Sequence, residues 1–125
     1  MKILDLLKNV SIDVNATCSN KDEAIDTLVS LMAKQGNLND QDVYKQGIYA
    51  REELSTTGIG EGIAIPHAQS EAVNAPGLAA MVVKDGVDYQ SLDNQPAKLF
   101  FMIAVPKTGG NEHLQILAML SQMLM

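Results

Sequence analysis

Two near-continuous apolar runs, at residues 78–83 and 99–105, constrain the fold of this 125-residue chain more than any other feature. Their length and their content of valine, isoleucine and phenylalanine are typical of β-strands. A strand that is apolar on both of its faces is buried on both faces. The sequence therefore predicts a sheet at the centre of the molecule, with other elements packed on each side of it.

Helical patterns precede and follow these runs. A helix is expected to begin after Ser19 or Asn20 and to end at Gly36, and a second one follows from residues 39–40 to Leu54. Shorter patterns predict a helical turn at residues 3–7 and strands at residues 10–14 and 63–65. Helices, then strands separated by turns, then a last helix indicate an α/β fold: a single mixed β-sheet flanked by helices on both faces.

The last helix is expected to begin at Asn111, which puts His113 in its first turn. The residues that follow are apolar on nearly every side of that helix up to Met125. A helix without a polar face is buried or expects another element against it. We therefore expect residues 1–125 to form a single domain that is truncated at its C-terminal end.

Charge and composition exclude some classes of function. Nine Lys and Arg residues against fifteen Asp and Glu residues give a net charge of -6, which argues against nucleic-acid binding. The single cysteine, Cys18, can form no internal disulfide and is expected to be structural. No signal peptide stands at the start, and no apolar run reaches the roughly 18 residues of a membrane span. We expect a soluble, cytoplasmic protein.

A glycine-rich segment at residues 57–67 carries the clearest functional signal. Its three glycines stand at alternate positions, and a short apolar run, Pro66 and His67 follow them. The pattern predicts a strand whose end presents His67 beside backbone that a ligand can approach closely.

Several common motifs do not fit this segment. A dinucleotide fingerprint would need glycine where Ile63 stands, and the segment leads into Pro66 rather than into a helix. No lysine follows in the place that a phosphate-binding Walker A loop requires. The two histidines are 46 residues apart and lack the spacing of metal ligands. We therefore expect neither a metal ion nor an organic cofactor.

A nucleophilic histidine fits the residues better. A neutral imidazole nitrogen can attack phosphorus, provided that an acceptor holds the proton on the other nitrogen. Arg51, the single arginine, offers a planar fork of donors suited to phosphate oxygens, and His113 is the second imidazole. The residues alone leave other interpretations open: His67 closing a turn, His113 facing water, and Arg51 as a solvated helix residue.

Residues 57–68 resemble the active-site signature of the fructose/mannitol family of enzyme IIA domains. These domains belong to the bacterial phosphoenolpyruvate-dependent sugar phosphotransferase system (PTS). The resemblance extends to residues 50–53 upstream and to residues 86–89, 99–103 and 113–114 downstream, so that it covers essentially the whole chain. The region from residue 87 to residue 103 is most similar to the fructose branch.

The resemblance implies a role for three residues. His67 would accept a phosphoryl group from the histidine phosphocarrier protein HPr and pass it to a cysteine of the cognate IIB domain. His113 would be the second active-site histidine, and Arg51 would stabilise the phosphate. The family fold is a mixed sheet flanked by helices, and contact with the membrane would be indirect, through the permease complex. The surface around His67 should be shallow and apolar, because two partners must reach it.

Two rival hypotheses belong to other classes of function. The same fold could serve as a nitrogen-type or regulator-linked module that signals its phosphorylation state instead of feeding a permease. A metal-dependent hydrolase that uses His67 and His113 is the third hypothesis.

Overall fold

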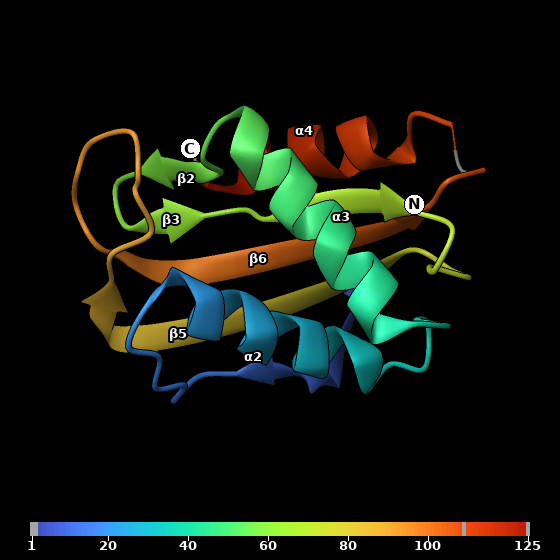
Figure 1. The fold of residues 1–125 in the computed structure, drawn as a ribbon, viewed down its shortest axis with the longest axis horizontal. Helices are drawn as coiled ribbons and strands as arrows, with labels where there is room; N and C mark the ends of the chain where they lie inside the picture. The colour runs from blue at the N-terminus through green and yellow to red at the C-terminus, as the bar shows by residue number, and fades with distance from the viewer. Residues whose placement is uncertain (1–2, 109, 125) are drawn as a thin grey trace.

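The computed structural model describes residues 3–108 and 110–124, and within them the strands form one six-stranded mixed sheet (Figure 1). The strand order is β1-β5-β6-β3-β2, and β4 pairs with β6 further along that strand. The elements follow in the order α1 (Ile3–Leu6), β1 (Leu7–Asp13), α2 (Lys21–Ala33), α3 (Gln41–Leu54), β2 (Gly58–Gly60), β3 (Ile63–Ala64), β4 (His67–Ser70), β5 (Gly77–Val87), β6 (Ala97–Pro106) and α4 (Glu112–Leu124).

The two predicted apolar runs form β5 and β6, which pair with each other in antiparallel register. β6 also pairs in parallel with β3 and with β4, while β1 pairs in parallel with β5. The prediction of two strands at the centre of the sheet is therefore confirmed.

Helices cover both faces of this sheet (Figure 1). α2 and α3 pack on one face over a core whose largest members include Tyr44, Phe100 and Met32. A smaller core on the other face joins Leu6 of α1 to Ile116 and Leu120 of α4. The predicted α/β class, with a single mixed sheet flanked on both faces, is confirmed.

Side-chain caps define where α2 and α3 begin, as the sequence predicted. The Asn20 side chain accepts a hydrogen bond from the backbone N–H of Glu23, at 2.8 Å. The Asp40 side chain accepts from the N–H groups of Asp42 and Val43. Each cap satisfies backbone donors that the first helical turn leaves unpaired.

The glycines of residues 58–62 serve the hairpin between β2 and β3. Its two turn residues, Glu61 and Gly62, both have positive φ (57° and 80°), as two-residue hairpins favour. A Cβ atom on Gly58 would lie 2.4 Å from the Ser91 hydroxyl oxygen. We expected the glycines to admit a ligand, but the close neighbour of Gly58 is the protein's own chain.

The strand that was predicted to present His67 at its end is interrupted at residues 65 and 66. β3 stops at Ala64, and β4 begins at His67, so that His67 opens a strand rather than closing one. The cause is the change of hydrogen-bond partner at residues 65 and 66. The N–H of Ile65 donates to Thr57, whereas Pro66 has no N–H and its carbonyl accepts from Ile103.

α4 is only partly covered. Ile116 and Leu120 are buried, but Leu114 is 54% exposed. The described side chains of this helix therefore present one buried face and one exposed face, and the sequence predicted a helix that is either buried or expects another element against it.

Candidate functional site

His67 lies at the start of β4, opposite Ile103 in the register with β6, and its side chain is half-buried. Its Nδ1 atom lies 2.8 Å from the carbonyl oxygen of Ile65. A carbonyl can only accept a hydrogen bond, so Nδ1 carries the proton in the neutral ring. The lone pair of the imidazole is therefore on Nε2, the nitrogen that can act as a nucleophile.

His67 and Arg51 line the same cleft, which has a volume of about 760 Å³. Its walls come from α3, from β2 and the segment that leads into it, from Ile65 and β4, from the β5–β6 connection and from α4. The lining residues are Gly47, Ala50, Arg51, Leu54, Ser55, Thr56, Thr57, Ile59, Ile65, His67, Ala68, Gln69, Leu92, Leu114 and Leu117. The structure thus brings together two of the three predicted site residues.

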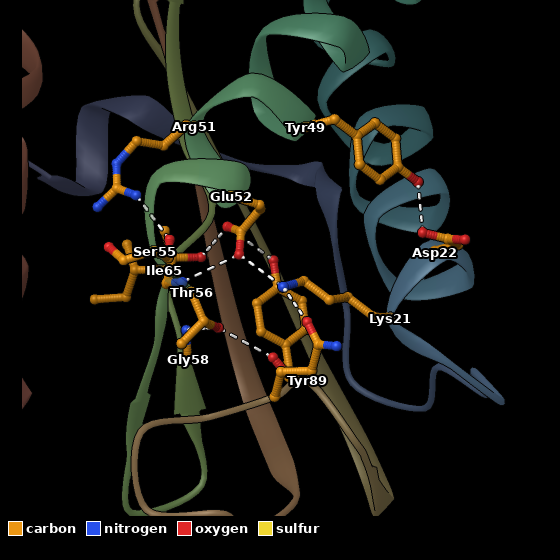
Figure 2. Close-up of polar contacts among 12 residues, drawn as sticks. Lys21, Asp22, Tyr49, Arg51, Glu52, Ser55, Thr56, Gly58, Ile65 and Tyr89 are labelled. Atoms are coloured by element: carbon orange, nitrogen blue, oxygen red, sulfur yellow. Dashed lines mark hydrogen bonds and ion pairs between the residues drawn. The ribbon is translucent and has the colours of Figure 1, made fainter.

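Arg51 occupies the last turn of α3, and its Nη1 donates to the carbonyl oxygen of Ser55 at 2.9 Å (Figure 2). The packing of α3 against the sheet fixes its position. The Tyr44 hydroxyl donates to Ile103, and a Cβ on Gly47 would lie 3.4 Å from the Cβ of Ala68. These residues recur at helical spacing along the face of α3 that lies over β4 and β6.

His113 lies in the first turn of α4, as predicted, but its side chain is outside the part of the structure that is described. The beginning of α4 nevertheless borders the cleft, because Leu114 lines it.

Two side chains near the site were not singled out by the sequence. Gln69 follows His67 at strand spacing, lines the cleft, and donates from Nε2 to the carbonyl of Gly110 at 2.9 Å. It thereby ties β4 to the loop that precedes α4. The alternation of strand residues, which puts positions 67 and 69 on one face, was the signal that could have found it.

Glu52 is the second such residue. Its side chain is only 5% exposed and forms an ion pair with Lys21 at 3.0 Å (Figure 2). It also accepts from the backbone N–H and the hydroxyl of Thr57 and from the Tyr89 hydroxyl. No periodicity marks this carboxylate, because Lys21 and Tyr89 come from distant segments.

Exposed apolar side chains surround the cleft. Leu54, Leu92, Leu114 and Ile59 are 82%, 70%, 54% and 49% exposed, and all four line it. The expectation of an apolar surface around His67 is confirmed. Large exposed apolar side chains that gather in one place mark a contact surface for other molecules.

The part of the chain whose side chains are described, which excludes those of Glu112 and His113, contains no cluster of metal-ligating side chains. No three His, Cys, Asp or Glu side chains gather there as ligands of one ion would. Within the same residues, no helix has both the length and the apolar character that crossing a bilayer requires.

Known proteins resemble this chain along its whole length. The model of the family "Phosphoenolpyruvate-dependent sugar phosphotransferase system, EIIA 2" matches residues 5–125. The PTS system fructose-specific EIIABC component of Bacillus subtilis is 50% identical over the whole chain, which spans 20% of that relative. The PTS system fructose-specific EIIA component of Haloferax volcanii is 44% identical over 86% of this chain and 70% of its own length.

Solved structures share the fold. The nitrogen regulatory protein IIA-Ntr of Neisseria meningitidis superimposes with a TM-score of 0.86 at 25% identity, over 94% of this chain and 80% of its own. The Escherichia coli complex of enzyme IIAMTL with phosphorylated enzyme IIBMTL matches with a TM-score of 0.80 at 26% identity, over 95% and 83%. The chain therefore belongs to the EIIA 2 family of the phosphoenolpyruvate-dependent sugar phosphotransferase system.

Proposed function

We propose that this domain carries phosphoryl groups for a sugar PTS of the fructose branch: it accepts phosphate from HPr on His67 and delivers it to a IIB domain. The observation that supports this most directly is the hydrogen bond between His67 Nδ1 and the Ile65 carbonyl, which leaves the lone pair on Nε2. The names of two relatives at 50% and 44% identity support the fructose branch.

The reaction is two successive displacements at phosphorus. In the first, Nε2 of His67 attacks the phosphorus of phospho-HPr, a new N–P bond forms, and the donor nitrogen leaves with the electron pair of the broken bond. In the second, a IIB cysteine thiolate attacks the same phosphorus, and Nε2 leaves with its pair. Positioning and charge stabilisation carry most of the catalysis in such transfers.

Arg51 is the group proposed to stabilise the transferred phosphate. It shares the cleft with His67, and its guanidinium can bind two phosphate oxygens at once. His113 is proposed as the second active-site histidine, since it lies in the turn of α4 that borders the cleft. The exposed leucines around the cleft would receive HPr and the IIB domain in turn, as small transient interfaces do.

The proposal places the domain in the cytoplasm, with the membrane contacted through the permease complex. A IIB partner is consistent with the matching structure of a IIA–IIB complex. The transported sugar would be fructose or a related sugar.

The test is reconstituted transfer from phosphoenolpyruvate through enzyme I and HPr to the purified domain. The wild-type domain should become labelled, and His67→Ala, checked for folding by circular dichroism, should not. Undiminished labelling of His67→Ala would remove the proposal. Nitrogen-resolved NMR of the phosphorylated domain should place the phosphoryl group on Nε2.

A regulatory role is the second candidate, because the fold also matches a nitrogen regulatory protein with a TM-score of 0.86. Transfer of the phosphoryl group from the domain to a IIB domain distinguishes the transport role from the regulatory role. Rapid loss of label to a IIB domain of the fructose type supports transport, whereas a stable phosphodomain that no IIB domain discharges supports signalling. Neighbouring IIB and IIC genes would favour transport.

A further inference from the structure

The carboxylate of Glu52 stands behind the site rather than in it. Arg51, its neighbour on α3, faces the cleft, whereas Glu52 points toward Lys21 and Tyr89 (Figure 2). Burying an ionised carboxylate costs free energy unless hydrogen bonds and an opposite charge compensate for it. Glu52 has both the hydrogen bonds and the opposite charge, so its carboxylate is held in one position.

The partners of Glu52 are themselves held by other contacts. The Lys21 ammonium lies 4.6 Å from the centre of the Tyr89 ring, a cation–π distance. The Tyr89 ring packs edge-on against Phe100 of β6, with centroids 5.6 Å apart. Glu52 is therefore anchored to the N-terminus of α2 and to the central strand of the sheet.

From this anchor a chain of hydrogen bonds leads to the proposed nucleophile. The backbone N–H of Thr57 donates to Glu52 Oε1 at 3.1 Å, and the Thr57 hydroxyl bonds to Oε2. The carbonyl of Thr57 accepts from the N–H of Ile65 at 3.0 Å. The carbonyl of Ile65 in turn accepts the Nδ1 proton of His67 at 2.8 Å.

We propose that Glu52 is a positioning residue for phosphoryl transfer, which acts through Thr57 and Ile65 to keep the proton of His67 on Nδ1. The rotation and tautomer of a histidine ring are set by the hydrogen bond that its second nitrogen makes. Although the carbonyl of Pro66 accepts from Ile103, Ile65 itself lies in the gap between β3 and β4 and pairs with no residue of β6. The bond to Thr57 holds it instead, and Glu52 holds Thr57.

The inference rests on the proposed function for its kinetic part, but its structural part can be tested without any partner protein. Nitrogen-15 NMR of histidine-labelled protein, at a pH where the imidazole is neutral, reports which ring nitrogen carries the proton. We expect the Nδ1–H form of His67 in the wild type. Glu52→Gln and Thr57→Val should each yield a mixture with the Nε2–H form.

Kinetics supply the second readout. The kcat for phosphoryl uptake from HPr should fall by at least the factor by which the Nδ1–H population falls, while the KM for HPr stays unchanged. Tyr49→Phe is the matched control. It also removes a hydrogen bond made by a residue of α3, because the Tyr49 hydroxyl donates to Asp22 of α2 at 3.1 Å. It should leave both the tautomer and kcat as in the wild type.

An unchanged His67 tautomer in folded Glu52→Gln would overturn the proposal and make the carboxylate purely structural. If Glu52→Gln does not fold, Thr57→Val decides by the same criterion. Loss of stability without a change of tautomer in Thr57→Val counts against the proposal as well. A wild-type domain that HPr cannot label would refute the proposed function, while the tautomer measurement would still decide the positioning role.

Discussion

The Tyr44 hydroxyl of α3 donates a 2.8 Å hydrogen bond to the carbonyl of Ile103, the residue of β6 that stands opposite His67 in the sheet. Tyr44 is fully buried. Through this bond, one residue of the central strand fixes both the helix that carries Arg51 and the strand that carries His67. The relative position of the two site residues is thus set from inside the core.

Tyr44→Phe should lower the free energy of unfolding by about 1–3 kcal/mol, because it leaves a buried carbonyl acceptor without this donor. Tyr49→Phe, whose hydroxyl bonds at the surface to Asp22, should cost less. Urea unfolding of both variants measures the difference. Equal losses of unfolding free energy in the two variants would show that the buried hydrogen bond to Ile103 stabilises the fold no more than the surface hydrogen bond to Asp22.

Alkaline pH should unfold the domain through its tyrosines. Burial raises the pKa of Tyr44, and burial followed by the charge of Glu52 raises that of Tyr89. The unfolded chain loses these phenolic protons above about pH 10, where the folded protein still keeps them. The free energy of unfolding therefore keeps its full value below pH 10. Above pH 10 it should fall by up to about 1.4 kcal/mol per pH unit for each of the two tyrosines.

Urea unfolding across this alkaline range, with Tyr44→Phe and Tyr89→Phe as comparisons, measures the slope. Each substitution should make the slope shallower. A slope that neither substitution changes would contradict the assignment to these two residues.

Arg51→Lys should weaken phosphoryl transfer more than folding. Lysine keeps the charge but cannot bind two phosphate oxygens as a fork. We expect kcat/KM to fall by about tenfold or more, which corresponds to roughly 1.4 kcal/mol, while the free energy of unfolding changes by less than about 1 kcal/mol. Parallel losses in both measurements would instead make Arg51 structural.

Gly58→Ala should destabilise the domain by about 2–3 kcal/mol, because its Cβ would meet the hydroxyl oxygen of Ser91 at 2.4 Å and the backbone of the same residue at 2.9 Å. Adding Ser91→Gly should recover part of the loss, since the backbone of residue 91 would still lie too close. Gly62 also has a positive φ, but a Cβ atom there would meet open space. Gly62→Ala should therefore lower the free energy of unfolding by only about 1 kcal/mol. Thermal unfolding ranks the three variants; a Gly58→Ala no worse than Gly62→Ala would argue against the clash.

Leu92→Asp should raise the KM for HPr by roughly tenfold and leave kcat almost unchanged, because it puts a charge on the apolar surface beside the cleft. Its stability should stay within about 0.5 kcal/mol of the wild type, since Leu92 is 70% exposed. Val14→Asp, at a residue that is 62% exposed and follows the strand at the opposite edge of the sheet, is the control. Equal effects of the two variants would mean that the docking surface lies elsewhere.

The sequence predicted those parts of the fold that depend on local or periodic signals. The caps at Asn20 and Asp40 and the apolar runs of β5 and β6 are of this kind. It was wrong about the strand before His67, because the break depends on the partner of Ile65, the distant Thr57 carbonyl. It predicted that Arg51 accompanies His67, but it assigned no role to Glu52, whose environment depends on segments far along the chain.

β6 joins β5, β3 and β4 into one sheet, although it begins only at Ala97. His67 pairs with Ile103, which follows it 36 residues later in the chain. During synthesis on the ribosome, the helix with Arg51 and the strand with His67 emerge well before the strand that joins them. The site therefore cannot take shape gradually as the chain emerges, and a nascent chain that ends before β6 carries both residues without a working arrangement of them.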